Sequence, residues 1–274
     1  MNTSMITSAN TLSQLQYKLD TLANNLANVN TTGFKRRQAV FSELLSQAIT
    51  AQPREMPRVT PHGIRIGYGA KVAQTTLRQD QGNPNVTERP LDFMIEGTGA
   101  WFRILSLTPG GEGEVLYTRD GSFYKTPYPA QAGIAFLTAA DGSPLLAAND
   151  ELILFPAHYD TFSLSPDGVL EISSGNNPQE RVVYRLDLAY ISRPDQLVAV
   201  GQNRFRLPDG EAPVINLALQ NGQIRLRQRA LESSNVDLAE EMTQLIATQR
   251  LMQFTARSIT LADEMLGLAN SIRS

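Results

Sequence analysis

Apolar residues near the N-terminus recur at alternating steps of three and four, which is the spacing of one helix face. The members of this heptad seam are Leu12, Leu15, Leu19, Leu22, Leu26 and Val29. The seam predicts one helix of about 40 Å over residues 3–29. Residues 30–33 predict its end, with Gly33 in the left-handed conformation that follows many helices and Phe34 as a hydrophobic contact. A shorter helical piece is expected roughly over Ala39–Ile49.

Residues 236–272 lack proline, contain only Gly267 as glycine, and carry two apolar stripes. The first stripe consists of Leu238, Met242, Leu245, Met252, Ala256, Ile259 and Leu266. The second consists of Leu251, Phe254, Leu261, Met265, Leu268 and Ile272. A helix with two apolar stripes needs partners on two sides. Its start is predicted at a capping box of Ser234 and Asp237, or with Asn235 as the cap.

The middle of the chain has the pattern of short strands joined by tight turns. The turn dipeptides are Asp120-Gly121, Asp141-Gly142, Asp167-Gly168, Asp209-Gly210 and Asn221-Gly222. The alternation on either side of Asn221-Gly222 predicts a hairpin built on Ile215, Leu217, Leu219, Ile224 and Leu226. Residues 184–190 alternate in the same way. No helix interrupts these strands, which favours an antiparallel sandwich or irregular barrel.

These patterns predict an α+β fold that is discontinuous in sequence. N- and C-terminal coiled-coil-forming helices pack together, and a central antiparallel all-β domain is inserted between them. We expect a terminal helical assembly domain of residues 1–50 and 228–274. Residues 51–69, marked by prolines and glycines, are expected to be an extended arm, and residues 70–227 the β-rich domain.

Composition narrows the classes of function. The chain of 274 residues has a formal net charge of -3 and no cysteine, which disfavours nucleic-acid binding and excludes disulfides and thiolate metal sites. His62 and His158 lie too far apart in sequence to suggest a histidine metal cluster. No apolar run is long enough for a transmembrane helix, and the N-terminus lacks the basic head of a cleavable signal peptide.

No catalytic constellation or cofactor motif is recognisable. Gly97-Thr98-Gly99 lacks the third glycine of a dinucleotide fingerprint. His158-Tyr159-Asp160 is a local cluster with acid–base potential, but a packed or surface role is the better interpretation. Lys35-Arg36-Arg37 could contact nucleic acid, but a solvated face or an inter-subunit salt bridge is favoured. We therefore expect no enzyme activity, no small-molecule substrate, no cofactor and no metal.

The two helical seams admit two interpretations. They could pack only on each other and close a monomer. A single N-terminal helix, however, covers one side of its partner and leaves Phe254, Leu261, Met265 and Leu268 exposed. Each would gain about 1.5–3 kcal/mol on full burial, so the pattern favours assembly.

Three segments resemble the bacterial flagellar rod and hook family. The first is Ala23-Asn24-Asn25-Leu26-Ala27-Asn28-Val29-Asn30-Thr31-Thr32-Gly33-Phe34-Lys35. The second is Leu231-Glu232-Ser233-Ser234-Asn235-Val236-Asp237, followed by Glu241-Met242 and Gln249-Arg250. The central one is Tyr117-Thr118-Arg119-Asp120-Gly121-Ser122-Phe123, preceded by Gly82, Pro90-Leu91-Asp92 and Ile95-Glu96-Gly97. Gly63-Ile64-Arg65-Ile66-Gly67 is most similar to distal-rod members.

The resemblance implies a structural subunit of a tubular axial assembly in the flagellar basal body, outside the cytoplasmic membrane. Its implied partners are copies of itself, other rod and hook subunits, and the flagellar type III export apparatus, which secretes such chains without a cleaved signal. The family-motif residues carried over are Asn24, Asn25, Asn28, Asn30, Thr32, Gly33, Leu231, Glu232, Ser234, Asn235 and Val236. The expected assembly interface comprises the N-terminal seam, Phe34, and Leu238, Met242, Leu245, Met252, Phe254, Ile259, Leu261, Met265 and Leu268.

Some positions depart from the family pattern, and two other functions stay open. Arg229 stands where the family usually has a glycine, Ala100-Trp101-Phe102 replaces a glycine-phenylalanine-phenylalanine run, and residues 124–150 read as longer than usual. One alternative is a coiled-coil adaptor of the rod–hook region that does not itself polymerise. The other is a wall-acting hydrolase, for which no paired carboxylates or nucleophile are recognisable.

Overall fold

The computed structural model describes residues 2–43, 46–49, 64–67, 70–107, 113–175, 179–208, 214–215 and 224–273. The chain divides into two compact units. Unit 1 comprises Met1–Ala27, Arg37–Thr76 and Asp237–Ser274, and unit 2 comprises Asn28–Arg36 and Leu77–Val236.

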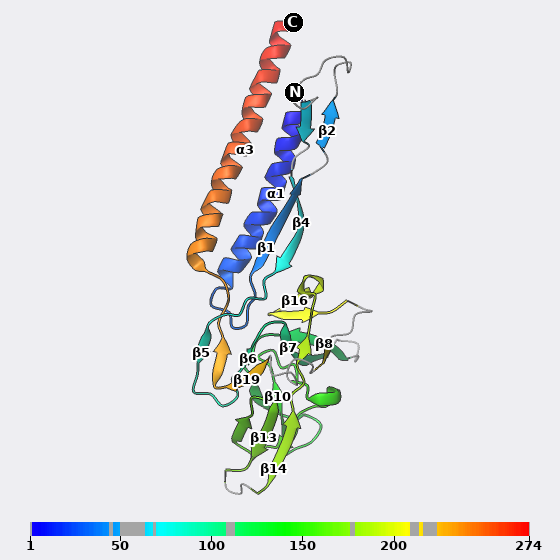
Figure 1. Cartoon of the computed structure of the whole chain (residues 1–274), viewed down its shortest axis with the longest axis vertical. Coiled ribbons are helices and arrows are strands. Elements are labelled where there is room, and N and C mark those ends of the chain that lie inside the picture. The colour runs from blue at the N-terminus through cyan, green and yellow to red at the C-terminus, as the bar shows by residue number, and fades with distance from the viewer. Residues whose placement is uncertain are drawn as a thin grey trace, which may run out of the picture. The chain divides into compact units, whose positions relative to one another are not determined.

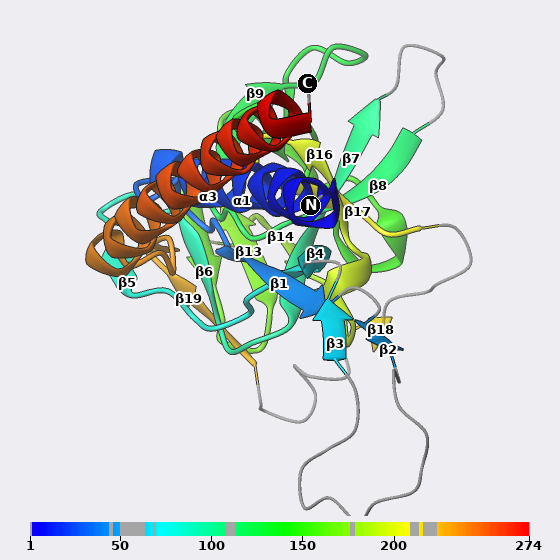
Figure 2. The ribbon, with the colours of Figure 1, turned by 90° about the horizontal axis from the view of Figure 1, so that it is seen from above.

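Two long helices dominate unit 1. Helix α1 spans Asn2–Ala27 and helix α3 spans Leu238–Arg273, and they lie side by side with the two chain ends at the same end of the unit (Figure 1). The same pairing is visible from above (Figure 2). Both helices fall within two residues of the ranges expected from the apolar periodicity. The terminal-helix prediction is therefore confirmed.

The remaining elements of unit 1 are strands. Strand β1 (Arg37–Glu43) pairs with β4 (Ala70–Leu77), and β2 (Ser46–Ile49) pairs antiparallel with β3 (Ile64–Gly67). The predicted helical piece over Ala39–Ile49 is thus wrong. Because strands that lie further along the chain supply backbone partners for this segment, tertiary pairing overrides its local pattern. Most of the expected arm, residues 51–63 and 68–69, lies outside the described residues.

Unit 2 is built from strands, and every described pair with a defined register within it is antiparallel. A six-stranded sheet has the order β16 (Val198–Gly201), β17 (Arg204–Arg206), β8 (Gly113–Thr118), β7 (Ala100–Leu107), β15 (Ala189–Tyr190), β18 (Val214–Ile215). The three-stranded sheets are β11 (Leu154–Pro156), β10 (Ile134–Thr138), β9 (Tyr124–Pro127), and β12 (Thr161–Leu164), β13 (Val169–Ser173), β14 (Arg181–Arg185). The two-stranded pairs are β19 (Arg225–Gln228) with β6 (Phe93–Glu96), and β20 (Ala230–Glu232) with β5 (Pro84–Val86). Two short 3-10 helices, Ala148–Asp150 and Pro194–Gln196, complete the described elements.

Strand β7 is buried on both of its faces and separates two hydrophobic clusters. Phe102 and Ile104 face the larger cluster, where Phe102 meets the Phe123 ring edge-on at 5.2 Å. Trp101 points the opposite way and packs at 5.1 Å from the Phe205 ring. This alternation follows from the two-residue period of a strand, and it explains why a nearly continuous apolar run is needed here.

The expected alternating strand over residues 184–190 is wrong, because the segment is split between β14 and β15. Of the expected hairpin, Leu217, Leu219 and Asn221-Gly222 lie outside the described residues. Ile215 lies in β18, which pairs with β15, and Leu226 lies in β19, which pairs with β6. The hairpin itself stays a prediction. In contrast, the Asp167-Gly168 turn does join β12 to β13, with Gly168 at a φ of 87°.

The start of α3 also differs from the expected capping box. The Asp237 carboxylate accepts hydrogen bonds from the backbone N–H groups of Ala239 at 2.9 Å and Glu240 at 3.2 Å, so Asp237 is the N-cap. Ser234 instead accepts a hydrogen bond from the Val236 N–H at 3.3 Å. The Asn235 side chain is engaged elsewhere, as described below.

Candidate functional site

Four segments of unit 2 that lie far apart in sequence meet along one line, which we call the motif seam: residues 31–36, 80–86, 119–121 and 230–236. The Gly33 N–H donates to the Glu232 carbonyl at 2.7 Å, and the Ser233 N–H donates to the Asn83 carbonyl at 2.9 Å. Thr32 donates through its hydroxyl to the Asp120 carboxylate at 2.9 Å. The motif seam thus places side by side the points where the chain enters and leaves unit 2.

An ionic cluster of Lys35, Arg119 and Glu232 lies inside the motif seam. The Lys35 ammonium is 2.6 Å from Glu232 Oε1, and Arg119 Nε is 2.6 Å from Glu232 Oε2. All three side chains are at most 2% exposed. Each carboxylate oxygen therefore has its own cation, and the Gly82 N–H adds a third donor at 2.8 Å from Oε1.

Backbone carbonyls accept further hydrogen bonds from the two cations. Lys35 donates to the Asp80 carbonyl at 2.9 Å. Arg119 donates to the carbonyls of Ala100, Ile95 and Gly97. Satisfied donors are what make buried charge tolerable, because an unpaired buried ion costs several kcal/mol.

Burial and the neighbouring charges shift the pKa values of Glu232 and Lys35 in the ionic cluster. Burial by itself raises the pKa of Glu232, but Arg119 and Lys35 outweigh burial and hold this pKa below its ordinary value. Burial, reinforced by the Arg119 charge, lowers the pKa of Lys35, although Glu232 opposes this. The cluster contains two cations and one anion, so Glu232 is the group on which its electrostatic balance depends.

Two glycines of the motif seam permit a close backbone approach. Gly33 has a φ of 65°, and a Cβ there would lie 2.5 Å from the Arg119 carbonyl carbon. A Cβ on Gly82 would lie 1.9 Å from the Ser233 oxygen. The expected left-handed Gly33 is confirmed, but it serves the contact between segments rather than the last turn of α1.

Asparagine side chains bind backbone in each unit. In unit 1, Asn25 is fully buried; it accepts from the Arg37 N–H at 3.0 Å and donates to the Arg37 carbonyl at 2.8 Å and to Glu241 at 3.1 Å. In unit 2, Asn235 accepts from the Arg36 N–H at 2.7 Å and donates to the carbonyls of Arg78 at 3.1 Å and Asp80 at 2.9 Å. These amides act as cross-links between segments.

The other carried-over motif residues have varied surroundings. Leu231 and Val236 are buried, and Asn28 accepts a hydrogen bond from the Thr31 hydroxyl at 3.1 Å. Asn24 and Asn30 are exposed.

The second apolar stripe of α3 is exposed in the structure, with Phe254 at 67%, Leu261 at 61% and Leu268 at 64% of their full accessible area. Leu251, Met265 and Ile272 are also exposed. Thr243, Ile246, Ala247, Arg250, Leu251 and Phe254 line a shallow groove of about 480 Å³ along the helix. A series of large apolar side chains in contact with water is typical of an interaction surface.

The first stripe of α3 is covered only in part. Leu245, Met252, Ile259 and Leu266 are half-buried, whereas Leu238, Met242 and Ala256 are exposed. On α1, Leu15 and Leu22 are buried, and Leu12, Leu19, Leu26 and Val29 are half-buried, as is Phe34 beyond the helix. The role of these residues in assembly stays a prediction.

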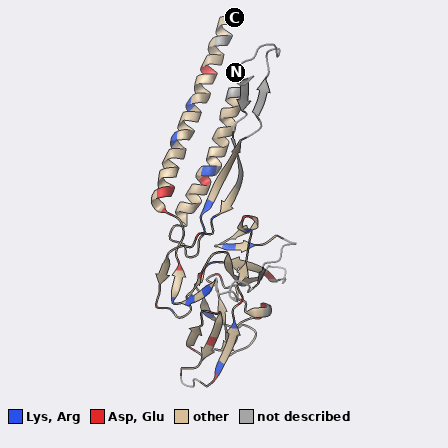
Figure 3. Cartoon of the chain, in the orientation of Figure 1, with Lys and Arg blue, Asp and Glu red and all other residues tan. Residues whose placement is uncertain are grey.

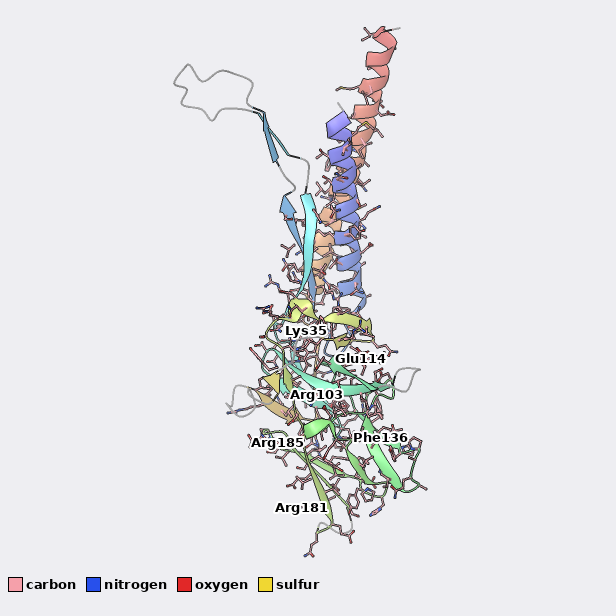
Figure 4. All side chains as sticks on the ribbon, turned by 90° about the vertical axis from the view of Figure 1, so that its right-hand side faces the viewer. Lys35, Arg103, Glu114, Phe136, Arg181 and Arg185 are labelled. Atoms are coloured by element: carbon pink, nitrogen blue, oxygen red, sulfur yellow. The ribbon has the colours of Figure 1, made fainter. Side chains whose placement is uncertain are left out.

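The structure corrects the interpretation of Lys35-Arg36-Arg37. Lys35 is neither solvated nor free for an inter-subunit salt bridge, because it is buried against Glu232 of the same chain (labelled in Figure 4). The roles of Arg119 and Glu232 as partners of Lys35 were not predicted from the sequence. The available signal was that each of the three matching segments carries a charged residue.

Two other sequence candidates have structural roles. Asp160 pairs with Lys125 at 2.6 Å, and the His158 ring packs edge-on against Tyr159 at 4.7 Å between centroids. No group of three or more histidine and acidic side chains that could hold a metal occurs among the described residues. Within the same residues, no helix is long and apolar enough to cross a membrane.

Comparisons with known proteins place these features in a family. A family model described as "Flagella basal body rod protein" matches residues 5–35, and one described as "Flagellar basal body rod FlgEFG protein C-terminal" matches residues 227–272. These ranges contain residues 31–35 and 230–236 of the motif seam.

Full-length relatives agree with the two family models. The chain is 36% identical to "Flagellar hook-basal body complex protein FlhP" of Bacillus subtilis, over 98% of this chain and 99% of the relative. It is 34% identical to "Flagellar basal-body rod protein FlgG" of Borreliella burgdorferi, over 97% of each chain, and 31% identical to the FlgG protein of Caulobacter vibrioides, over 98% of each. The fold and these matches define a structural component of the bacterial flagellum. The chain belongs to the flagellar basal-body rod protein family, and it is a structural rod subunit located in the flagellar basal body.

Proposed function

We propose that this subunit polymerises through its terminal helices. In the polymer, the exposed stripe of α3 is covered by a second copy of the chain or by a neighbouring rod or hook subunit. The observation that carries the proposal is the exposure of Phe254, Leu261 and Leu268 on a helix already packed on one side by α1. Charged residues are sparse along α1, and on α3 they are spread between the apolar positions (Figure 3). Such a surface gains free energy when a second apolar surface excludes water from it.

The proposal includes the route to the assembly site. The chain leaves the cytoplasm through the flagellar type III export apparatus without a cleaved signal, and its helices gain their missing partners at the growing tip. The helices lose conformational entropy when they become ordered against neighbours, and this cost offsets part of the free energy gained by burial. The smaller net gain disfavours polymerisation before the chain reaches the growing tip. The lack of cysteine is compatible with the passage of an unfolded chain. The proposed role is structural, without enzyme activity.

Leu261→Asp tests the assembly surface. Leu261 is 61% exposed, so the substitution spares the core of the free subunit but places a charge where a neighbour would bury it. The matched control is Gln253→Asp, at an exposed polar position of the same helix. We expect Leu261→Asp to abolish rods in electron micrographs of basal bodies while circular dichroism of the purified subunit is unchanged, and Gln253→Asp to support normal rods. Normal rods with Leu261→Asp would overturn the proposal.

The non-polymerising adaptor makes a different prediction for the same experiment. An adaptor forms complexes of fixed size with its partners, which light scattering detects as a finite mass at all subunit concentrations. Polymerisation through α3 gives a mass that rises with concentration and that Leu261→Asp removes.

A further inference from the structure

The ionic cluster lies where three distant segments of unit 2 meet, and its position suggests a role of its own. Lys35 comes from the segment where the chain enters unit 2, and Glu232 from the segment where it leaves. Arg119 comes from the turn after β8, in the middle of unit 2. One buried carboxylate therefore joins the first, central and last parts of unit 2.

The charge balance makes Glu232 unequal to its two partners. If the Glu232 carboxylate is removed from the ionic cluster, two buried cations remain with no anion, and the Gly82 N–H loses its acceptor. If Lys35 loses its charge, Arg119 and Glu232 still form a neutral pair. Because an uncompensated buried charge is far more costly than a balanced pair, the two losses have very different consequences.

The hydrogen bonds around Glu232 show what its departure would release. Its backbone carbonyl accepts from Gly33, and the next residue, Ser233, donates to Asn83. Strand β20, which ends at Glu232, pairs with β5, a strand whose three residues are all exposed. The segment 230–233 thus contacts β5 and Gly33 directly beside the ionic cluster, while the sheet β12–β13–β14 does not contact the cluster through any described hydrogen bond.

We propose that Glu232 holds the four segments of the motif seam together, an arrangement that we call the latch. The motif seam then opens and closes as a cooperative unit that is separate from the other β-strands of unit 2. Before residues 230–236 dock, Lys35 and Arg119 lack their anion, so docking of this late segment is the step that completes unit 2. Local opening of this kind is a general property of proteins with unevenly distributed stability. The latch is independent of how subunits assemble.

Amide hydrogen exchange on the full-length protein tests the latch. The Gly33, Gly82 and Ser233 amides report on the motif seam, and the amides of β13 report on the rest of unit 2. We expect Glu232→Gln to accelerate exchange in the motif seam by about a hundredfold or more with little change in β13. Lys35→Met should accelerate it by less than about tenfold, because a balanced pair remains.

The double variant Lys35→Met/Glu232→Gln separates charge imbalance from loss of packing. It removes one of the two uncompensated cations, so its motif seam should exchange more slowly than that of Glu232→Gln alone. The matched control is Glu171→Gln, which breaks an exposed ion pair with Arg181 (3.7 Å) at the opposite end of unit 2 from Lys35 and should leave both regions unchanged (Figure 4).

Three results would overturn the latch. The first is an unchanged motif seam in Glu232→Gln. The second is equal acceleration of the motif seam and β13, which would make the cluster an ordinary part of one cooperative core. The third is a double variant that exchanges as fast as, or faster than, Glu232→Gln, since charge imbalance would then not be the cause. If Glu232→Gln does not fold, Lys35→Met still decides the case: acceleration confined to the motif seam supports the latch, and acceleration shared with β13 contradicts it.

Discussion

Glu232 and Phe254 belong to the same C-terminal part of the chain, yet their surroundings are opposite. The charged side chain of Glu232 is 2% exposed and has a partner for each carboxylate oxygen. Phe254, an aromatic residue, is 67% exposed on α3. Soluble proteins usually show the reverse distribution, in which charges remain in water and aromatic rings are buried.

The difference shows which contacts the single chain completes. In the ionic cluster, unit 2 pairs buried charges with partners from its own segments. Unit 1 covers one side of α3 with α1 and leaves large apolar side chains on the other. Burying a charge without a partner costs several kcal/mol, so a buried charge needs a partner within the fold. Leaving an apolar side chain exposed to water has a more moderate free-energy cost per residue. We therefore interpret unit 2 as self-sufficient and α3 as the part that depends on other subunits.

The largest expected effect contrasts a buried and an exposed apolar residue of unit 1. Leu22→Ala removes a side chain that is 5% exposed, and we expect it to lower the free energy of unfolding by about 2–5 kcal/mol. Phe254→Ala should change it by no more than about 0.5 kcal/mol in the free subunit. Thermal unfolding followed by circular dichroism at the helical band measures both. Comparable losses for the two variants would mean that Phe254 is already covered within the monomer.

Acid should weaken unit 2 through Glu232. Its pKa is held below the ordinary value of 4.5 in the folded protein and returns to that value on unfolding. The stabilisation is therefore fully present above pH 4.5 and is lost as the pH falls through the lower, folded-state pKa. Urea unfolding followed by the fluorescence of Trp101, the sole tryptophan, should show a steeper acid loss for the natural protein than for Glu232→Gln. Parallel acid profiles would contradict the cluster's role in stability.

A smaller effect is expected at the start of α3. Asp237→Ala removes the acceptor of two backbone N–H groups and should destabilise the helix by about 1 kcal/mol. Ser234→Ala serves as the control, because Ser234 does not cap the helix. Equal effects of the two substitutions on the helical signal would restore the capping box that the sequence suggested.

The smallest effect concerns backbone strain in unit 2. Arg229 has a φ of 58°, at the position where the family resemblance predicts glycine. A left-handed conformation costs a non-glycine residue about 1–2 kcal/mol, and the greater flexibility of glycine when unfolded offsets part of that. Arg229→Gly should therefore raise the free energy of unfolding by less than about 1 kcal/mol, which is seen as a slightly higher urea midpoint. A lower midpoint would show that the exposed Arg229 side chain contributes a contact of its own.

The sequence predicted those features that depend on local periodicity. The heptad spacing of Leu12 to Val29 predicted α1, and the two apolar stripes predicted α3. Both predictions were possible because the periodicity of a helix is contained within one continuous segment. Left-handed Gly33 was predictable because glycine often follows the end of a helix, although here it serves a contact between segments. Strands β1 and β2 were not, because their partners β4 and β3 lie further along the chain, and local pattern cannot identify a distant partner.

The ionic cluster was beyond local inference for a stronger reason. No pattern around Lys35, Arg119 or Glu232 predicts that a charged residue is buried there, and their burial follows only once three distant segments are brought together. The buried Glu241 and Thr248 on the covered side of α3 were also missed, since an apolar stripe gives no sign of polar residues within it. Glu241 is accommodated by the Asn25 amide at 3.1 Å, again a contact between the two ends of the chain.

The most direct test of the dependence of α3 on other subunits uses the absence of cysteine from the chain. Phe254→Cys introduces a single thiol whose reaction rate with a maleimide reports its exposure. In the free subunit the thiol should react nearly as fast as in the urea-unfolded chain, and in purified basal bodies that contain this variant it should react far more slowly. Equally fast labelling in the assembled rod would show that no neighbour covers α3, and the account would be contradicted.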